Sequence, residues 1–289
     1  MKKLLIASTA LVATAGMASA DITISGSANA GIHSGLDTAG ASTAVVADGI
    51  YSNAGVAFAL SGATDNGISF SASVDVMAGN KVDQGDFEYD GDDDGAMDLG
   101  SVAMSGTFGT LTFDNGGIEN LYSDGLSNAD VSYSTTVGAV ALTVAHDTDA
   151  ASTGANSVSA GYTASGMAFT LTASEVAAGG TSTKLAVAYA LNDSVSLSGK
   201  TDQAAGAESV QTIGAKTTLN GVSVSVESAN NSTWDVDLGY TAGGFALTYG
   251  VDETDGWTAT ATSALGGGAT FAAGVDSNDS MYAGVSFAF

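Results

Sequence analysis

The acidic run from Asp90 to Asp98 has the spacing closest to a metal-binding motif. Ser101 stands at position 12 of that frame, where a calcium loop of the EF-hand type carries a bidentate glutamate. We expect either a weak Ca²⁺ site in an exposed loop or a solvated acidic loop without an ion. Oxygen ligands occupy positions 1, 3, 5 and 9, and a glycine occupies position 6: Asp90, Asp92, Asp94, Asp98 and Gly95.

Residues that could pair a nucleophile with a base are scarce. The chain has no cysteine, and its two histidines are His33 and His146. No Gly-x-Ser-x-Gly motif occurs. The segment Gly199 to Thr201 resembles the end of a phosphate-binding loop, but Ser194 stands where that loop needs its first glycine. These patterns predict that the protein is not an enzyme.

Three of the four lysines beyond residue 20 are Lys184, Lys200 and Lys216, and each falls on the polar side of an apolar–polar alternation. A lysine that faces lipid at the membrane midplane costs roughly 2–4 kcal/mol, so we expect all three to face an aqueous interior. They either act as pore charges or only offset nearby acids such as Asp193, Asp202 and Glu208.

The elements that carry these residues are short segments of period-two alternation, which is typical of strands with one apolar and one polar face. Helical spacing is nowhere sustained. The clearest strand segments are 22–32, 50–60, 68–76, 140–144, 167–171, 185–191, 222–226, 234–240, 245–251 and 281–289.

The connections alternate between tight turns and longer polar loops, which is the organisation of an outer-membrane barrel. Counting hairpins predicts an all-β, antiparallel, up-and-down transmembrane barrel of 16 to 18 strands. The tight turns are 64–67, 165–166, 192–193, 220–221, 243–244 and 266–268.

Residue composition agrees with a membrane-spanning sheet that has no edge strand. Beyond residue 20 no apolar run approaches the roughly 18 residues of a transmembrane helix. The chain has no proline, a residue that is confined to edges and bulges in sheets. Without cysteine, the chain cannot be a small fold held by disulfides.

The first 20 residues predict a cleaved secretory signal peptide, with Lys2 and Lys3, an apolar stretch and the small-residue site Ala18 to Ala20. Residues 21–289 would then form the barrel domain. With four lysines, no arginine and 31 acidic residues, this part carries a net charge of −27. Such a charge excludes nucleic acid and predicts cations as partners.

The last segment ends on an apolar aromatic residue, Phe289. Chain ends usually fray into solvent, so this end must be paired, as it is when the last strand closes on the first. Aromatic residues near strand ends also predict girdles at the two membrane interfaces: Trp234, Tyr240, Tyr249, Trp257, Tyr282, Phe287 and Phe289.

With these features the chain resembles the bacterial general-diffusion porins of the Gram-negative outer membrane, particularly those of alphaproteobacteria. The resemblance runs from Lys2 to Phe289 and depends on three features. They are the signal peptide followed by the strand from Asp21 to Ile32, the segment from Ser105 to Asp114, and the terminal strand that ends in phenylalanine.

The resemblance implies a homotrimer whose third long loop folds into the lumen as a constriction loop. It also implies that Phe289 is recognised by the barrel-insertion machinery. The family carries basic residues on the wall opposite the loop, whereas this chain has no arginine and, we expect, no lysine on its early strands. The matching loop would run from Asp114 to about Asp130 and carry Asp114, Glu119, Asp124 and Asp130.

The leading functional hypothesis is a water-filled channel for passive diffusion of ions and small hydrophilic solutes across the outer membrane, with a preference for cations. No cofactor is required, although Ca²⁺ could bind. The competing hypothesis is a structural or surface-interaction barrel with acidic, calcium-binding loops and no open pore.

Overall fold

The structure is a computed structural model that describes residues 19–38, 41–45, 47–93, 97–123, 126–148, 156–176 and 179–289. The regular elements in these ranges are 21 β-strands, joined in one sheet. No helix in the described ranges is long and apolar enough to cross a membrane. Most of the predicted signal peptide lies outside the described residues, and the first strand begins at Ser19.

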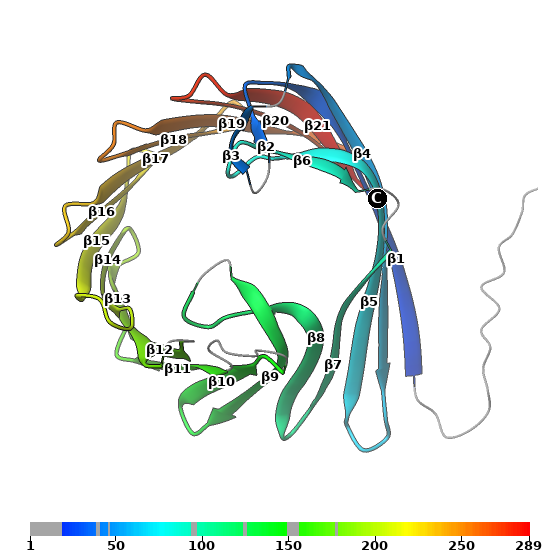
Figure 1. The fold of residues 1–289 in the computed structure, drawn as a ribbon, viewed down its shortest axis with the longest axis vertical. Helices are drawn as coiled ribbons and strands as arrows, with labels where there is room; N and C mark the ends of the chain where they lie inside the picture. Colours follow the sequence, from blue (N-terminus) through cyan, green and yellow to red (C-terminus); the bar gives the residue numbers. More distant parts are fainter. Residues whose placement is uncertain are drawn as a thin grey trace, which may run out of the picture.

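Eighteen of the strands follow one another around a closed antiparallel barrel (Figure 1). This number is within the predicted range of 16 to 18. The wall strands are β1 (Ser19–Ser34), β4 (Gly49–Ala63), β5 (Ser69–Asp83), β7 (Met97–Gly106), β8 (Gly109–Glu119), β9 (Ser127–Val137), β10 (Val140–His146), β11 (Asn156–Ala164), β12 (Met167–Glu175), β13 (Thr181–Asn192), β14 (Val195–Gln203), β15 (Val210–Leu219), β16 (Val222–Ala229), β17 (Trp234–Ala242), β18 (Phe245–Asp252), β19 (Trp257–Gly266), β20 (Ala269–Asp276) and β21 (Met281–Ala288).

The barrel closes where the last strand pairs with the first. Strand β21 runs antiparallel to β1, with Ala30 opposite Val285. Phe289 then continues the ladder, because its carbonyl accepts from the Gly26 amide at 2.6 Å and its amide donates back at 3.0 Å. The prediction that the aromatic C-terminus is paired is confirmed.

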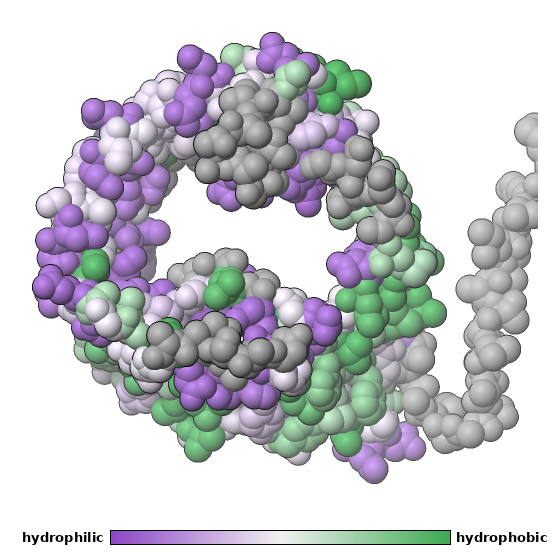
Figure 2. Space-filling view, in the orientation of Figure 1, coloured by the Kyte–Doolittle hydropathy of each residue, from purple (hydrophilic) through white to green (hydrophobic). Residues whose placement is uncertain are grey.

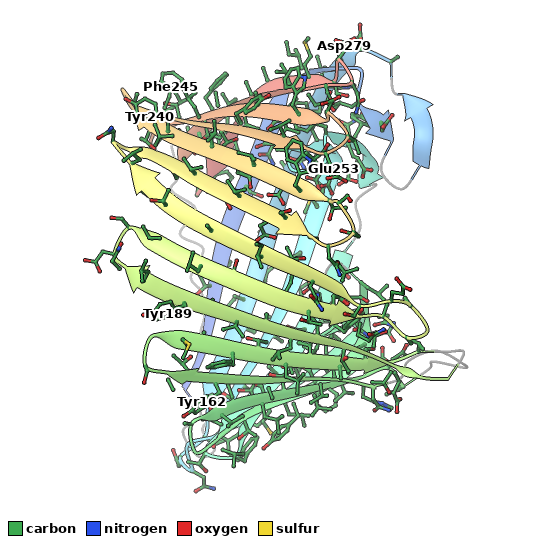
Figure 3. All side chains as sticks on the ribbon, turned by 90° about the vertical axis from the view of Figure 1, so that its left-hand side faces the viewer. Tyr162, Tyr189, Tyr240, Phe245, Glu253 and Asp279 are labelled. Atoms are coloured by element: carbon green, nitrogen blue, oxygen red, sulfur yellow. The ribbon has the colours of Figure 1, made fainter. Side chains whose placement is uncertain are left out.

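The two ends of the barrel differ in the length of their connections (Figure 3). At the turn end the strands are joined by tight turns with left-handed residues, such as Asn220 (φ 52°) and Gly221 (φ 84°). These positive φ values match the twist of a two-residue hairpin and explain the Asn-Gly sequence. Longer loops join the strands at the opposite end, which we call the loop end.

The alternation along each strand separates a lipid-compatible outer face from a polar lumen. On β13, Leu185 and Tyr189 are exposed on the outer face, and Lys184 lies on the opposite face. Tyrosines 162, 189 and 240 mark the turn end of the outer wall in Figure 3. In Figure 2 polar residues line the lumen and apolar residues cover the outer wall of β1, β4 and β5.

Two sets of residues fold into the lumen from opposite sides (Figure 1). One is the hairpin of β8 and β9. The other contains three short strands, β2 (Asp37–Thr38), β3 (Ala41–Val45) and β6 (Glu88–Asp93), which the sequence did not predict. β6 pairs antiparallel with β5 and parallel with β2. The loop that follows β1 and the loop that follows β5 therefore both contribute to this second set.

Two expectations about single residues are wrong. Tyr282 is 4% exposed and packs inside the barrel, so it is not part of an aromatic girdle. Tyr282 and Gly284 are two residues apart on β21, so both face the lumen, and this explains the position of Tyr282. Lys81 lies on β5, so an early strand does carry a lysine.

Candidate functional site

The β8–β9 hairpin leaves the wall at an irregularity in its ladder. Phe113 pairs with Val131, but the next pair is Ile118 with Ala129, so four residues of β8 oppose the single residue Asp130. An insertion of this kind bends a strand and redirects it. The distal part of the hairpin therefore points into the lumen instead of continuing the barrel.

Asp130 holds this bend in place. Its Oδ1 accepts a hydrogen bond from the Gly116 amide at 2.8 Å. Its Oδ2 accepts from the amide and the hydroxyl of Thr148, at 2.7 and 2.5 Å. Three donors from two segments fix this carboxylate, and it joins the base of the hairpin to the loop after β10.

The hairpin tip docks on the inner wall of β11 to β14. The Asn120 side-chain amide donates to Ser174 Oγ on β12 at 3.0 Å. The Leu121 backbone amide donates to Ser157 Oγ on β11 at 3.1 Å. The wall thus binds the tip through small hydroxyl side chains that face inward.

Tyr122 makes further contacts between the tip and the wall. Its hydroxyl donates to Asp202 Oδ1 on β14 at 2.5 Å, and its carbonyl accepts from Lys184 Nζ on β13 at 3.0 Å. The same ammonium group lies 5.3 Å from the centre of the Tyr122 ring and 4.0 Å from Asp202 Oδ2. Burial, followed by the Asp202 carboxylate, raises the pKa of the Tyr122 hydroxyl above its usual value.

The four predicted loop carboxylates do not form one cluster. Asp130 accepts hydrogen bonds at the base of the hairpin, and Asp114 lies in the bulge beside Gly117. Glu119 ends β8 as an exposed side chain next to the tip. Asp124 lies outside the described residues. The inward fold that the family resemblance implied is present, with its carboxylates spread along the hairpin.

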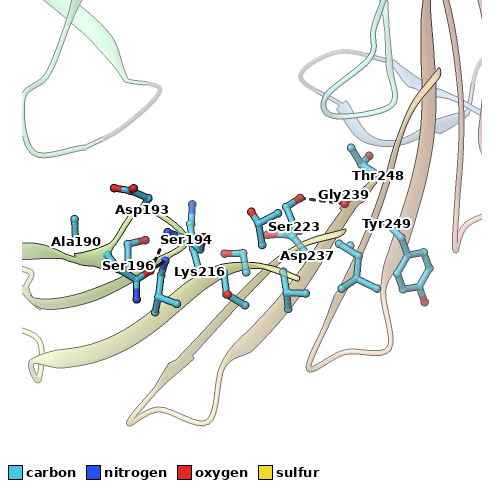
Figure 4. A pocket seen from close by; sticks show the side chains of 18 of the residues that line it. Ala190, Asp193, Ser194, Ser196, Lys216, Ser223, Asp237, Gly239, Thr248 and Tyr249 are labelled. Carbon is cyan, nitrogen blue, oxygen red and sulfur yellow. Dashed lines mark hydrogen bonds between the residues drawn. The ribbon is translucent and has the colours of Figure 1, made fainter. Parts of the chain in front are cut away.

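The three predicted inward lysines lie on adjacent strands, β13, β14 and β15. Lys184 contacts the hairpin tip. Lys200 forms an ion pair with Glu227 at 3.8 Å. Lys216 lines a concave part of the inner wall with a volume of about 890 Å³, together with Asp193 and Asp237 (Figure 4).

A group of carboxylates on β16 to β18 was missed by the sequence reasoning. In the strand register Glu227 lies opposite Asp235, and Asp235 lies opposite Asp252. Three acids therefore stand side by side across three neighbouring strands. Asp237 lies two residues from Asp235 on the same inward face. The alternation of these acids with Val226, Val236 and Val251 indicated that each acid faces the lumen. Only the strand register showed that the acids are neighbours. We call Glu227, Asp235, Asp237 and Asp252 the acidic wall.

The acidic run of the sequence is divided between two strands. Asp90 lies on β6 and is 3.3 Å from Lys81 Nζ, whereas Asp98 lies on β7 opposite Asp75. Asp94 is outside the described residues, as is the side chain of Asp92. The described residues contain no group of three or more His, Cys, Asp or Glu placed to hold a metal. The calcium site stays a prediction.

Comparison with known proteins agrees with this geometry. A family model described as Gram-negative porin matches residues 7–288. No curated protein sequence matches the chain.

Solved structures share the fold at low sequence identity. A triple mutant of Rhodopseudomonas blastica porin superposes with a TM-score of 0.55 at 15% identity, over 93% of this chain and 100% of that chain. A second mutant of the same porin reaches 0.54 at 16% identity, with the same coverage of both chains. A porin refined at 1.8 Å resolution reaches 0.52 at 16%, again over 93% and 100%.

Proposed function

Because this chain belongs to the Gram-negative porin family, we propose that it is a diffusion channel that passes small hydrophilic solutes and prefers cations. As a porin it is an outer-membrane channel protein and not an enzyme. Figure 2 shows an open passage between the hairpin and the opposite inward segment, which favours a conducting pore over a closed structural barrel.

The acidic wall is the observation that carries the cation preference. Asp237 is exposed to the lumen, and Asp235 lies between two other acids in the register. Lys200 is paired with Glu227, and both Lys200 and Lys216 interact electrostatically with Asp235, so two lysines stand against the four carboxylates of the acidic wall and negative charge remains in excess. In a narrow passage with walls of low dielectric constant, unneutralised carboxylates raise the local concentration of cations.

Asp252 contributes differently from its neighbours. Its Oδ1 accepts hydrogen bonds from the amide and hydroxyl of Thr254 at 2.8 and 2.7 Å, and from the Gly256 amide at 3.1 Å. These bonds shape the turn between β18 and β19, so replacing Asp252 would disturb the loop. Asp235 and Asp237 are therefore the better positions at which to test the role of charge.

The test is reconstitution of the purified protein in a planar bilayer under a KCl gradient. We expect stepwise conductance and a reversal potential that favours K⁺ over Cl⁻, reduced severalfold in Asp235→Asn/Asp237→Asn. Asp65→Asn, in an exposed turn, is the matched control. A silent membrane would contradict the channel function. Unchanged selectivity in the double variant, with a shift in Asp114→Asn/Glu119→Gln, would instead assign selectivity to the hairpin.

We also propose a homotrimer in which β20, β21, β1, β4, β5 and β7 face the other copies. Tyrosine and tryptophan prefer the membrane–water interface. In the described chain their outward-facing members all lie on β9 to β19, namely Tyr133, Tyr162, Tyr189, Trp234, Tyr240, Tyr249 and Trp257.

A pair of matched substitutions tests this interface. Ala54 on β4 and Ala160 on β11 both face outward, but only Ala54 lies in the proposed interface. Ala54→Trp should convert trimer to monomer on electrophoresis of unheated samples in mild detergent, because an indole side chain would prevent close approach. Ala160→Trp should leave the trimer intact. Equal behaviour of the two variants would contradict the assignment.

A further inference from the structure

The second inward-folded segment lies at the loop end, opposite the β8–β9 hairpin. It consists of Leu36 to Thr38, which includes β2, and of Gln84 to Asp90, where the chain leaves β5 and returns as β6. We call these residues the mouth lobe. β2 and β6 pair in parallel through Asp37 with Glu88, so the two loops form one unit inside the ring of wall strands (Figure 1).

The mouth lobe is held by a cluster of buried apolar side chains. Leu36 is 0% exposed and Phe87 is 5% exposed. Both belong to a cluster with Tyr51 and Tyr282, which point inward from β4 and β21. The Phe87 and Tyr282 rings lie 5.3 Å apart, and the Tyr282 hydroxyl donates to the Gln84 carbonyl at 3.3 Å.

The wall provides a seat for the Phe87 ring at Gly274. A Cβ atom added to Gly274 would lie 2.9 Å from Phe87 Cζ and 2.6 Å from Tyr282 Cε1. Only glycine at this position of β20 lets the two rings approach the sheet. The lobe and the inner wall are therefore complementary in shape.

The backbone of Phe87 is strained. Its φ is 57°, in the left-handed region that bulky residues rarely adopt. The preceding turn is stabilised by Asp83 Oδ1, which accepts from the Gly85 amide at 2.8 Å. Such a conformation persists only where the surroundings impose it, and here the buried ring does so.

The face of β6 that is turned away from the wall is acidic. Tyr89 packs toward the wall, with its ring 4.7 Å from that of His33 on β1. Because side chains alternate along a strand, Glu88 and Asp90 lie on the opposite face, toward the passage. Asp90 is paired with Lys81, whereas no described residue forms an ion pair with Glu88.

We propose that the mouth lobe is a second element that determines solute size and charge, so that the passage is bounded by the β8–β9 hairpin on one side and the lobe on the other. This inference rests on the proposed channel function. Its ligand class is the same small hydrophilic solutes, which would pass between Glu88 and the hairpin.

The first test removes the anchor without changing the turn. Phe87→Asn keeps a residue that tolerates the left-handed region and deletes the buried ring. We expect a larger single-channel conductance and a severalfold rise in the liposome-swelling rate for a trisaccharide relative to a monosaccharide. Ser232→Asn, at another left-handed position (φ 73°) in the short loop between β16 and β17, is the control.

The second test leaves the lobe folded and uses the absence of native cysteine. Glu88→Cys, labelled with a bulky uncharged thiol reagent, should reduce conductance by half or more. Glu208→Cys, an exposed acid in the loop between β14 and β15, should change little when labelled. If the wild type conducts and neither Phe87→Asn nor labelled Glu88→Cys changes the conductance, the inference is overturned. A wild type that does not conduct would overturn the channel function itself.

Discussion

The two inward-folded segments are held to the barrel by different forces. The hairpin tip is bound by polar contacts, from Tyr122 to Asp202, from Lys184 to the Tyr122 carbonyl, and from Asn120 to Ser174. The mouth lobe is bound by buried apolar side chains, chiefly Leu36 and Phe87. The position of the hairpin tip therefore depends on charges and on the protonation of its partners, whereas the position of the mouth lobe depends on apolar packing.

This difference has a physical origin in the wall. β11 to β14 present hydroxyl and charged side chains at the loop end, which offer hydrogen-bond partners to the hairpin tip. β20 and β21 present Gly274 beside Tyr282, a shallow apolar seat. Each inward segment carries side chains that match its own part of the wall.

The largest expected effect is at Leu36, which is fully buried in the mouth lobe. Leu36→Ala should cost about 2–5 kcal/mol of local stability, because it leaves a cavity in a fully buried cluster. Amide hydrogen exchange of β6 would measure the loss. Leu126→Ala, in the loop of the other segment, removes the same atoms from a side chain that is 48% exposed and should cost much less. Equal effects would mean that the lobe is not held by packing.

A smaller effect is expected at the ion pair of Lys184 and Asp202, two wall residues that both contact the hairpin tip. Lys184→Met removes the donor to the Tyr122 carbonyl and leaves Asp202 without its cation, at a cost of about 1–3 kcal/mol. Faster exchange of the amides of residues 120–123 and noisier single-channel current would report it. Lys81→Met breaks a more exposed pair, with side chains 42% and 33% exposed, and should cost less than about 1 kcal/mol.

The smallest effect is a dependence of the hairpin on alkaline pH. Docking raises the pKa of the Tyr122 hydroxyl above the usual value of 10.0. As the pH rises, the free tip therefore loses this proton before the docked tip does. This stabilisation is complete below about pH 10 and is lost as the pH rises through the raised pKa. Current noise should increase in that range, and Tyr122→Phe should abolish the transition. A transition that persists in Tyr122→Phe would assign it to another group.

Much of the barrel could be predicted from local patterns. Alternation identified strands such as Leu185 to Leu191, and Asn220-Gly221 identified a turn, because side-chain direction and left-handed φ depend on near neighbours. The terminal Phe289 predicted closure for a similar reason, since an apolar strand end needs a partner. These features concern one strand or one turn at a time.

The parts that were missed or misplaced depend on contacts between distant strands. The acidic wall needed the register that places Glu227, Asp235 and Asp252 in one row. Tyr282 was assigned to a girdle because aromatic residues near strand ends suggest one, although its parity points inward. The short strands of the mouth lobe carry no clear alternation, and their pairing joins loops about fifty residues apart.

The sequence by itself determined that the chain is an antiparallel barrel with an apolar outside, a polar inside and an acidic lumen, because period-two alternation and turn chemistry are local properties. Only the tertiary structure decided how far the lumen is narrowed and by what. Whether a loop folds inward depends on a seat such as Gly274 or a partner such as Asp202, and these are supplied by strands far away in the sequence.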